Sequence, residues 1–342
     1  MNRLFKKTLS LMLVIVMTVS LGVSAAAADQ TGAAQAEGPL GIVSAMSVEL
    51  NALVEATKIS KTEEIAGNTF YEGVLNGVDV VLVKAGIGKV LAVASGKGGV
   101  GKSTVTANLA LTLRNMGYRV GILDADIYGP SQPKMFGVEG YLPDAERIDG
   151  EDCILPADAM GIKLMSIGFF IKPSDALIWR DAMATNALRQ MIHQTKWGGL
   201  DFLLVDLPPG TGGVHLAVIS ELKVTGAVIV STPQQVAVAD VARGVEMFRN
   251  ENVRIPVAGI VENMAWFTPA ELPENRYYLF GRGGAREYAE RNGVDFLGEI
   301  PIVQSIMEGS DAGLPAAATH PLVEERYRDI ARRIVEKVMK AG

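Results

Sequence analysis

Apolar residues occur in short, nearly continuous runs, separated by stretches in which they recur every three or four positions. The runs after Leu91 read "VLAVAS", "YRVGILDAD", "LDFLLVDLP", "GAVIVSTP" and "VAGIVENM". Such runs are typical of parallel strands buried on both faces, and "KSTVTANLALTLRNMG" has helical spacing with Gly117 near its end. The pattern predicts an α/β fold, a doubly wound and mainly parallel sheet that binds ligands at the carboxyl ends of its strands.

The region from Leu40 to Val90 has a different pattern. "LGIVSAM" predicts a buried strand, and Ser47 is placed to cap a helix over "VELNALVEATK". Asn76-Gly77 predicts a hairpin between two strands in "TFYEGVLNGVDVVLVKAG". These elements would form a small, incomplete βαββ segment that exposes a hydrophobic face when alone.

The two ends of the chain are apolar in different ways. Residues 1–28 combine a cationic start, the apolar run "LSLMLVIVMTVSLGV" and the small residues "SAAAAD", which is the order of a secretory signal peptide. That run is shorter than the roughly 20 residues of a membrane-spanning helix, so no stable span is expected, with an uncleaved anchor or buried helix as the alternative. Residues 29–38 form a polar spacer.

At the other end "LVEERYRDIARRIVEKVMKAG" predicts an amphipathic helix that packs on the sheet or, alternatively, docks on a membrane surface.

Composition narrows the choice of chemistry. The 342 residues are 49% hydrophobic and 20% charged, which is a globular composition, and the net charge of −6 gives no reason to expect a nucleic acid partner. Cys153 is the single cysteine, which excludes an internal disulfide and a zinc site of several thiolates. His193, His215 and His320 show no metal-ligand spacing and are expected to be surface or helix residues.

The segment "GKGGVGKS" follows a predicted strand and opens a predicted helix, as a phosphate-binding loop requires. Glycines let backbone N–H groups approach phosphate oxygens, and the helix N-terminus favours an anion. Lys102 would reach the β- and γ-phosphates, and Ser103 would place its hydroxyl on Mg²⁺. A glycine-rich turn that binds nothing is the alternative. The predicted phosphate cradle comprises Gly96, Lys97, Gly98, Gly99, Val100, Gly101, Lys102 and Ser103.

The early lysine gives this loop a family resemblance. "KGGVGKS" resembles the deviant Walker A motif of the family that contains MinD, ParA, the nitrogenase iron protein and Mrp. The resemblance implies ATP with Mg²⁺ as the bound nucleotide and a homodimer in which Lys97 reaches the partner's phosphates. A second cation there can neutralise charge as the γ-phosphoryl group departs. A solvated loop lysine is the alternative.

Acidic residues follow two of the strands. "ILDADIYGP" carries Asp124 and Asp126, and "FLLVDLPPGTGG" resembles a Walker B strand that ends in Asp206. By resemblance Asp126 orients or activates the attacking water, Asp124 supports the magnesium shell, Asp206 binds magnesium through water, and Gly210 senses the γ-phosphate. Mg²⁺ needs few carboxylates. Each aspartate could instead cap a helix or turn.

Further segments narrow the resemblance to the Mrp/ApbC iron–sulfur carrier ATPases, over residues 91–342. They include "LDADIYGPSQPKMFGV", "WRDAMATNALRQM", "STPQQVAVADVARG" and "GIVENMAWF". The resemblance implies ATP hydrolysis coupled to delivery of clusters to apo iron–sulfur proteins, with an adenine contact at Asn263, for which a capping or turn role is the alternative. It implies a catalytic set of Lys97, Lys102, Asp126 and Asp206.

One interval departs from the family pattern. Many members carry a CxxC after the "ENM" segment, and a dimer then supplies the four thiolates of a 4Fe-4S cluster. Here the interval reads "WFTPAELPENRYYLFG" and contains no cysteine. Cys153 lies elsewhere and is expected to be an ordinary small apolar residue. A 4Fe-4S cluster is therefore possible by family, but direct binding does not follow from the sequence.

The first glycine cluster carries a second resemblance. "GIVSAMSVEL" and "AGIGKV" resemble the start of methylthioadenosine/S-adenosylhomocysteine nucleosidase, with Glu49 at the position of the glutamate that orients the attacking water. The downstream aspartate of that family is missing, so half a site should not turn over. Glu49 is otherwise an exposed first-turn helix glutamate. Residues 39–90 are thus predicted to be a nucleosidase-like remnant fused to an ATPase, through a natural fusion or a recombined reading frame.

Two other functions stay open from the sequence alone. A ParA/MinD-type positioning switch would use ATP to control binding to a surface, and an exported nucleosidase fragment without activity would fit the leader. The compartment is also open, because the signal peptide predicts export whereas an ATPase needs the ATP of the cytoplasm.

Overall fold

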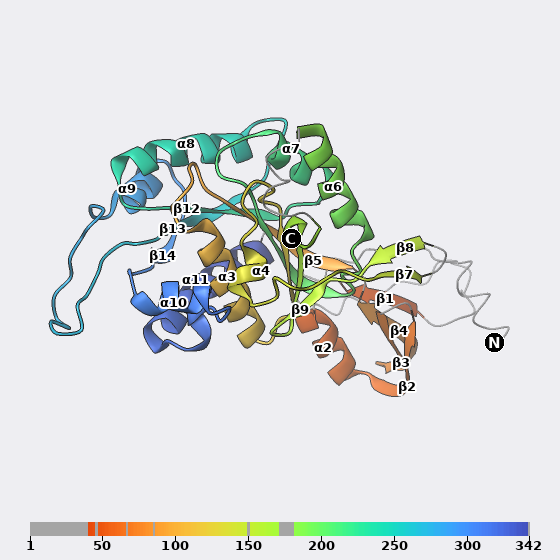
Figure 1. The fold of residues 1–342 in the computed structure, drawn as a ribbon. Coiled ribbons are helices and arrows are strands. Elements are labelled where there is room, and N and C mark those ends of the chain that lie inside the picture. Colours follow the sequence, from red (N-terminus) through yellow and green to blue (C-terminus); the bar gives the residue numbers. More distant parts are fainter. Residues whose placement is uncertain are drawn as a thin grey trace. The chain divides into compact units, whose positions relative to one another are not determined.

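The computed structural model describes residues 40–44, 47–65, 68–84, 86–148, 151–170 and 181–340 (Figure 1). The chain divides into two compact units, with the boundary between Gly86 and Ile87. The predicted signal peptide and spacer lie outside the described residues, as does the side chain of Glu49.

The first unit is a four-stranded sheet with one helix. Its strands, in the order β1-β4-β3-β2, are β1 (Leu40–Ser44), β4 (Val78–Lys84), β3 (Asn68–Leu75) and β2 (Lys58–Ile65). β1 runs parallel to β4, and the other pairs are antiparallel. Helix α2 (Ser47–Ala56) contributes Leu50 to a small core with Val80 and Leu82.

The predicted hairpin is present, but the unit has one strand more than predicted. Asn76 and Gly77 both adopt positive φ, 51° and 85°, as a tight turn between β3 and β4 needs. The extra strand is β2, whose sequence "KISKTEEI" contains few apolar residues. It lies at the sheet edge and is largely exposed, so no burial pattern marks it in the sequence.

The second unit is built on an eight-stranded sheet of order β14-β13-β12-β5-β11-β6-β10-β9. Every neighbouring pair is parallel except β9 with β10 at one edge. The strands are β5 (Ile87–Ala94), β6 (Val120–Asp124), β9 (Ala157–Ala159), β10 (Ile162–Ser166), β11 (Leu200–Asp206), β12 (Gly226–Ser231), β13 (Val257–Glu262) and β14 (Phe296–Glu299). Strand β5 begins at Ile87, four residues before Leu91, from which the ATPase-like pattern was predicted to start.

Helices cover both faces of this sheet, which confirms the doubly wound prediction (Figure 1). Strands β11 and β12 are buried along their whole length as a result. On one face lie α3 (Lys102–Asn115), α4 (Gln132–Met135), α10 (Gln304–Asp311) and α11 (Pro321–Lys340). On the other lie α6 (Asp181–Gln194), α7 (Gly213–Glu221), α8 (Gln235–Arg249) and α9 (Gly284–Arg291).

The C-terminal helix packs on the second unit through its apolar face, as predicted. Its buried residues include Ile330, Ile334 and Val338, and it contacts α3, β13 and β14. Among the residues that the structure describes, no helix has the length and apolar character needed to cross a bilayer.

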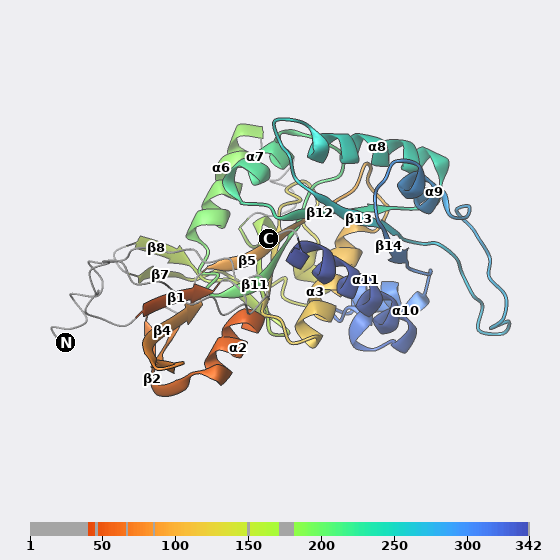
Figure 2. The same ribbon diagram turned by 180° about the vertical axis from the view of Figure 1, so that it is seen from behind.

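A long excursion, residues 263–283, connects β13 to α9 and projects from the sheet; Figure 2 shows it from behind. Phe267 and Tyr277 bridge its two arms near the base. This excursion contains the cysteine-free interval. A separate two-stranded ribbon, β7 (Ala145–Ile148) and β8 (Glu151–Ile154), carries the half-buried Cys153.

Candidate nucleotide and magnesium site

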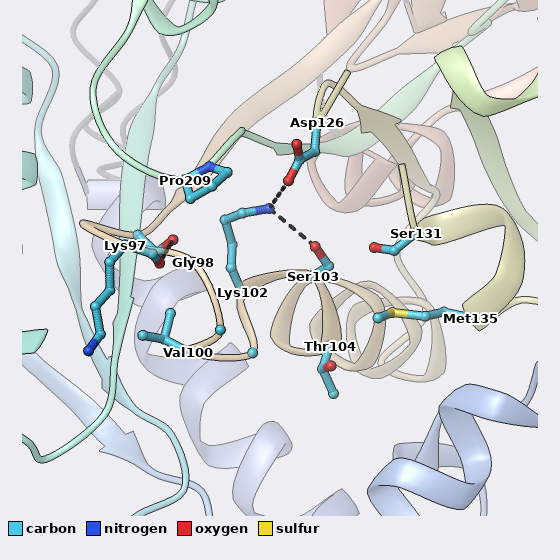
Figure 3. Close-up of a pocket in the computed structure, with 13 residues that line it drawn as sticks. Lys97, Gly98, Val100, Lys102, Ser103, Thr104, Asp126, Ser131, Met135 and Pro209 are labelled. Atoms are coloured by element: carbon cyan, nitrogen blue, oxygen red, sulfur yellow. Dashed lines mark hydrogen bonds and ion pairs between the residues drawn. The ribbon is translucent and has the colours of Figure 1, made fainter. Parts of the chain in front are cut away.

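The predicted phosphate loop joins the central strand β5 to the start of α3. It borders a cavity of about 240 Å³ that also touches Asp126, Ser131, Met135 and Pro209 (Figure 3). Because α3 begins at Lys102, its first backbone N–H groups have no partner within the helix and face this region. The arrangement is that of an anion site.

Two glycines of the loop are required by packing as well as by phosphate chemistry. A Cβ at Gly96 would lie 2.3 Å from the carbonyl oxygen of Asp240, on α8. Gly101 has φ 80°, and a Cβ there would lie 2.3 Å from Asn263 Nδ2. A side chain at Gly96 would collide with the backbone of α8, whereas one at Gly101 would strain the loop at its positive φ and push the Asn263 amide away.

Lys102 is almost fully buried and lies among three of the predicted site residues. Its Nζ is 2.5 Å from Asp206 Oδ1 and 3.7 Å from Asp126 Oδ2. It also donates a hydrogen bond to Ser103 Oγ at 3.2 Å (Figure 3). The ends of β6 and β11 therefore meet the phosphate loop at one point, as the parallel sheet requires.

Two neutral donors also hold the fully buried carboxylate of Asp206. Thr106 Oγ1 donates to Oδ1 at 3.1 Å, and Gln132 Nε2 donates to Oδ2 at 2.8 Å. Neither residue was predicted from the sequence. The i+4 spacing from Lys102 was a signal for Thr106, which lies one helical turn further along α3, whereas no spacing marks Gln132.

Asp124 has both of its oxygens engaged by the chain. Its carboxylate accepts hydrogen bonds from the backbone N–H groups of Asp126 (3.3 Å) and Gln132 (3.2 Å) and from Ser166 Oγ (2.9 Å). Burial, with the nearby Asp206 carboxylate, raises the pKa of Asp124 to about 7. Burial likewise raises the pKa of Asp126. Three carboxyl groups thus surround one lysine, an arrangement that a further cation would stabilise.

The chemistry of this donor set fits magnesium. Ser103 Oγ and Asp206 offer hard oxygen ligands, and Mg²⁺ characteristically adds water and substrate phosphates to one or two protein groups. Across the described ranges no three His, Cys, Asp or Glu side chains converge to hold a metal ion. A magnesium ion here would therefore depend on the nucleotide for part of its shell.

The remaining predicted residues surround the loop. The Lys97 side chain points away from Lys102 (Figure 3). Gly210, with φ 87°, donates its N–H to the Ser95 carbonyl at 2.9 Å and so ties the β11 loop to the phosphate loop. Asn263 is buried and donates from Nδ2 to the Val100 carbonyl at 2.9 Å. Its Oδ1 and the second hydrogen of Nδ2 are therefore the groups that it can offer to a base.

His193 and His215 are a surface residue and a helix residue, as expected, but His215 is also deeply buried. His193 is exposed and pairs with Glu221 at 2.8 Å. His215 is only 1% exposed at the start of α7, where Nδ1 accepts the Gly212 N–H at 3.0 Å. Burial lowers the pKa of His215 to about 4, so the ring is neutral at physiological pH. The apolar residues next to it in the sequence, Val214 and Leu216, did not indicate that His215 would be buried and neutral.

The comparisons with known proteins agree with this geometry. A protein-family model described as "ParA: NUBPL iron-transfer P-loop NTPase" matches residues 86–339. An iron–sulfur cluster carrier protein from Aquifex aeolicus is 48% identical over 238 residues, which cover 69% of this chain and 64% of that protein. The iron–sulfur cluster transfer protein NUBPL from Dictyostelium discoideum is 43% identical, covering 74% and 77%. The chain thus spans less than two thirds of the Aquifex relative's length.

Solved structures place the fold in the same group. A nucleotide-binding protein from Archaeoglobus fulgidus in complex with ADP has a TM-score of 0.57 and 43% identity, covering 66% of this chain and 86% of that one. The MinD cell division protein of Aquifex aeolicus, at 21% identity, shares the fold with a TM-score of 0.51, covering 72% and 97%. Sequence, fold and loop geometry together show that the chain belongs to the family of NUBPL iron-transfer P-loop NTPases.

Proposed function

We propose that this protein hydrolyses Mg·ATP and acts in the delivery of iron–sulfur clusters to apo-proteins. The observation that carries the proposal is the buried Lys102, held within 4 Å of both Asp126 and Asp206 at the mouth of a phosphate loop. The names of the relatives supply the cluster-delivery part.

The residues have distinct roles in this proposal. Phosphates bind the loop amides, and Lys102 exchanges its contact with Asp206 for the β- and γ-phosphates. Ser103 and Asp206 would hold magnesium, which would draw electron density from the γ-phosphate. Asp126 orients the attacking water and receives its proton as the water oxygen bonds to phosphorus and the bond to ADP breaks. Burial raises the pKa of Asp126, which favours its acting as a base.

Three further roles follow from position. Lys97 lines the cavity but its side chain points away from Lys102, which favours a homodimer in which it contacts the partner's phosphates. Asn263 offers Oδ1 to the adenine amino group, and the Nδ2 hydrogen that the Val100 carbonyl does not take can donate to the base. Gly210 would contact the γ-phosphate from the loop that follows β11, and Asp124 would support the magnesium shell.

In this proposal the iron–sulfur cluster is the cargo, and the chain by itself cannot supply four thiolate ligands to it. A 4Fe-4S cluster takes four cysteine ligands, and Cys153 is the only cysteine of the sequence. Most of its ligands would come from the donor or recipient protein. The ATPase cycle would then control when the carrier and its partner associate.

The alternatives gain less support. A ParA/MinD-type switch that binds a surface through α11 would need its apolar face, which is already packed in the second unit. We also propose that residues 1–28 are a signal peptide, 29–38 a spacer and 39–90 a nucleosidase-like remnant without activity, ahead of the ATPase. Release of adenine from methylthioadenosine by the purified protein would contradict the last part.

Two substitutions at Lys102 test the ATPase proposal. Lys102→Ala should abolish hydrolysis and, because it leaves a buried carboxylate unpaired, destabilise the fold by about 3–5 kcal/mol. Lys102→Arg keeps a cation beside Asp206 but cannot reproduce the lysine geometry, so it should lose activity at nearly unchanged stability. Lys223→Ala, at an exposed lysine, is the control. Full ATP turnover by a folded Lys102→Arg protein would refute the assignment.

A second assay tests cluster delivery. The protein, a cluster donor and an apo-protein that gains activity with a 4Fe-4S cluster are mixed with and without Mg·ATP. Activation should be faster with the parent and ATP than with Lys102→Arg. Equal activation rates with the parent and with Lys102→Arg would refute a role of ATP hydrolysis in cluster delivery and leave the ATPase proposal standing.

A further inference from the structure

The Gln132 side chain is fully buried against the Asp206 carboxylate, and the proposed mechanism assigns it no role. Its amide nitrogen donates to Asp206 Oδ2 at 2.8 Å and to the Ser103 carbonyl at 3.0 Å. Both partners can only accept hydrogen bonds. The chemistry therefore fixes the orientation of the amide and uses both hydrogens of its NH₂ group.

The amide oxygen is left without a partner. Gln132 Oε1 is buried and makes no hydrogen bond within the described segments of the chain. An unpaired buried acceptor costs about 1–3 kcal/mol, so such a group commonly faces a bound water or ion. Amide oxygen and nitrogen atoms are about 2.2 Å apart, which puts Oε1 within about 5 Å of Asp206 Oδ2. One water molecule can bridge that distance.

The contacts of Asp206 show why a neutral amide is useful there. When Lys102 moves to the phosphates, Asp206 loses the cation with which it is paired. Thr106 and Gln132 remain, each with one carboxylate oxygen. Neutral donors fix the direction of a carboxylate without cancelling the charge that attracts a divalent cation.

We propose that Gln132 is a positioning residue for magnesium, which orients Asp206 and offers Oε1 to a water of the ion's shell. The inference rests on the proposed nucleotide site and deepens it. Gln132 does not line the cavity, so it acts through Asp206 and water, not on the phosphates. Partners in such outer positions commonly change metal affinity 10–100-fold.

Gln132→Met tests the inference, because it keeps the length of the side chain and removes both polar atoms. ADP binding to the full chain is measured in EDTA and then over a magnesium titration. ADP affinity in EDTA should stay within about twofold of the parent, while half-maximal magnesium rises by about tenfold or more. A purely structural role would lower the melting temperature without moving the magnesium midpoint. Gln190→Met, on an exposed part of α6, is the matched control.

Each outcome decides between this inference and the proposed function. A magnesium midpoint within twofold of the parent would overturn the role of Gln132 and leave the ATPase proposal standing. A parent protein that binds no ADP, or binds it without any effect of magnesium, would overturn both. If the variant does not fold, a crystal structure of the parent with ADP and magnesium decides. A metal-bound water within hydrogen-bond distance of Oε1 is expected, and its absence refutes the inference.

Discussion

The buried histidine beside the β11 loop should make stability fall in mild acid. His215 is neutral in the fold with a pKa of about 4, whereas a histidine in the unfolded chain titrates at about 6.5. Between these values the unfolded state binds a proton that the folded state does not, so lowering the pH favours unfolding. At pH 5, protonation of this histidine favours the unfolded state over the folded state by a factor of about 30. The free energy of unfolding should therefore be about 2 kcal/mol lower at pH 5 than at pH 7.5.

The perturbation that isolates this effect is His215→Asn. Asparagine does not titrate here, and its Oδ1 can replace Nδ1 as the acceptor for the Gly212 N–H. Urea unfolding of both proteins at pH 7.5 and pH 5.0 gives four free energies. The parent should lose about 2 kcal/mol more than the variant between the two pH values. Trp197 and Trp266 are buried in the second unit, so their fluorescence reports its unfolding.

Comparing the two proteins removes other titrating groups from the result. Asp124 contributes in the opposite direction, because its raised pKa makes stability fall as the pH rises from about 4 to about 7. That contribution is common to parent and variant and cancels in the difference. A difference in pH dependence below about 0.5 kcal/mol would refute the reasoning, since a ring that titrates equally in both states cannot be desolvated as the structure indicates.

Three other substitutions have defined outcomes. Lys97→Ala should lower ATP turnover on the order of 10³-fold. Mixing it with Lys102→Ala should restore part of the activity, and no recovery in a proven mixed dimer would count against a role across the dimer. Asn263→Ala should weaken ADP binding about tenfold, because it removes the hydrogen bond to Val100 and the contact with the base. An unchanged dissociation constant for ADP would show that neither contact contributes to ADP binding. Leu204→Ala, at a fully buried position of β11, should cost about 2–5 kcal/mol in urea unfolding, and a cost below 1 kcal/mol would mean that the strand is not central.

Much of the fold could be predicted because its signals are local. The apolar runs that became β6, β11, β12 and β13 and the loop that opens α3 each lie within about ten residues of sequence. Burial on both faces forces a strand to be apolar throughout, and that pattern can be read without knowing its neighbours. Strand β2 was missed for the same reason, since an exposed edge strand carries no burial pattern.

By itself the sequence determined the phosphate loop, the α/β class and which aspartates end strands. Only the tertiary structure decided that Gln132 and Lys102 share the Asp206 carboxylate, although they lie 74 and 104 positions from it. It also decided that His215 is neutral and that the Asn263 amide holds the phosphate loop. Hydrogen bonds and desolvation depend on distances in space, and a parallel sheet brings together strand ends that the chain keeps far apart.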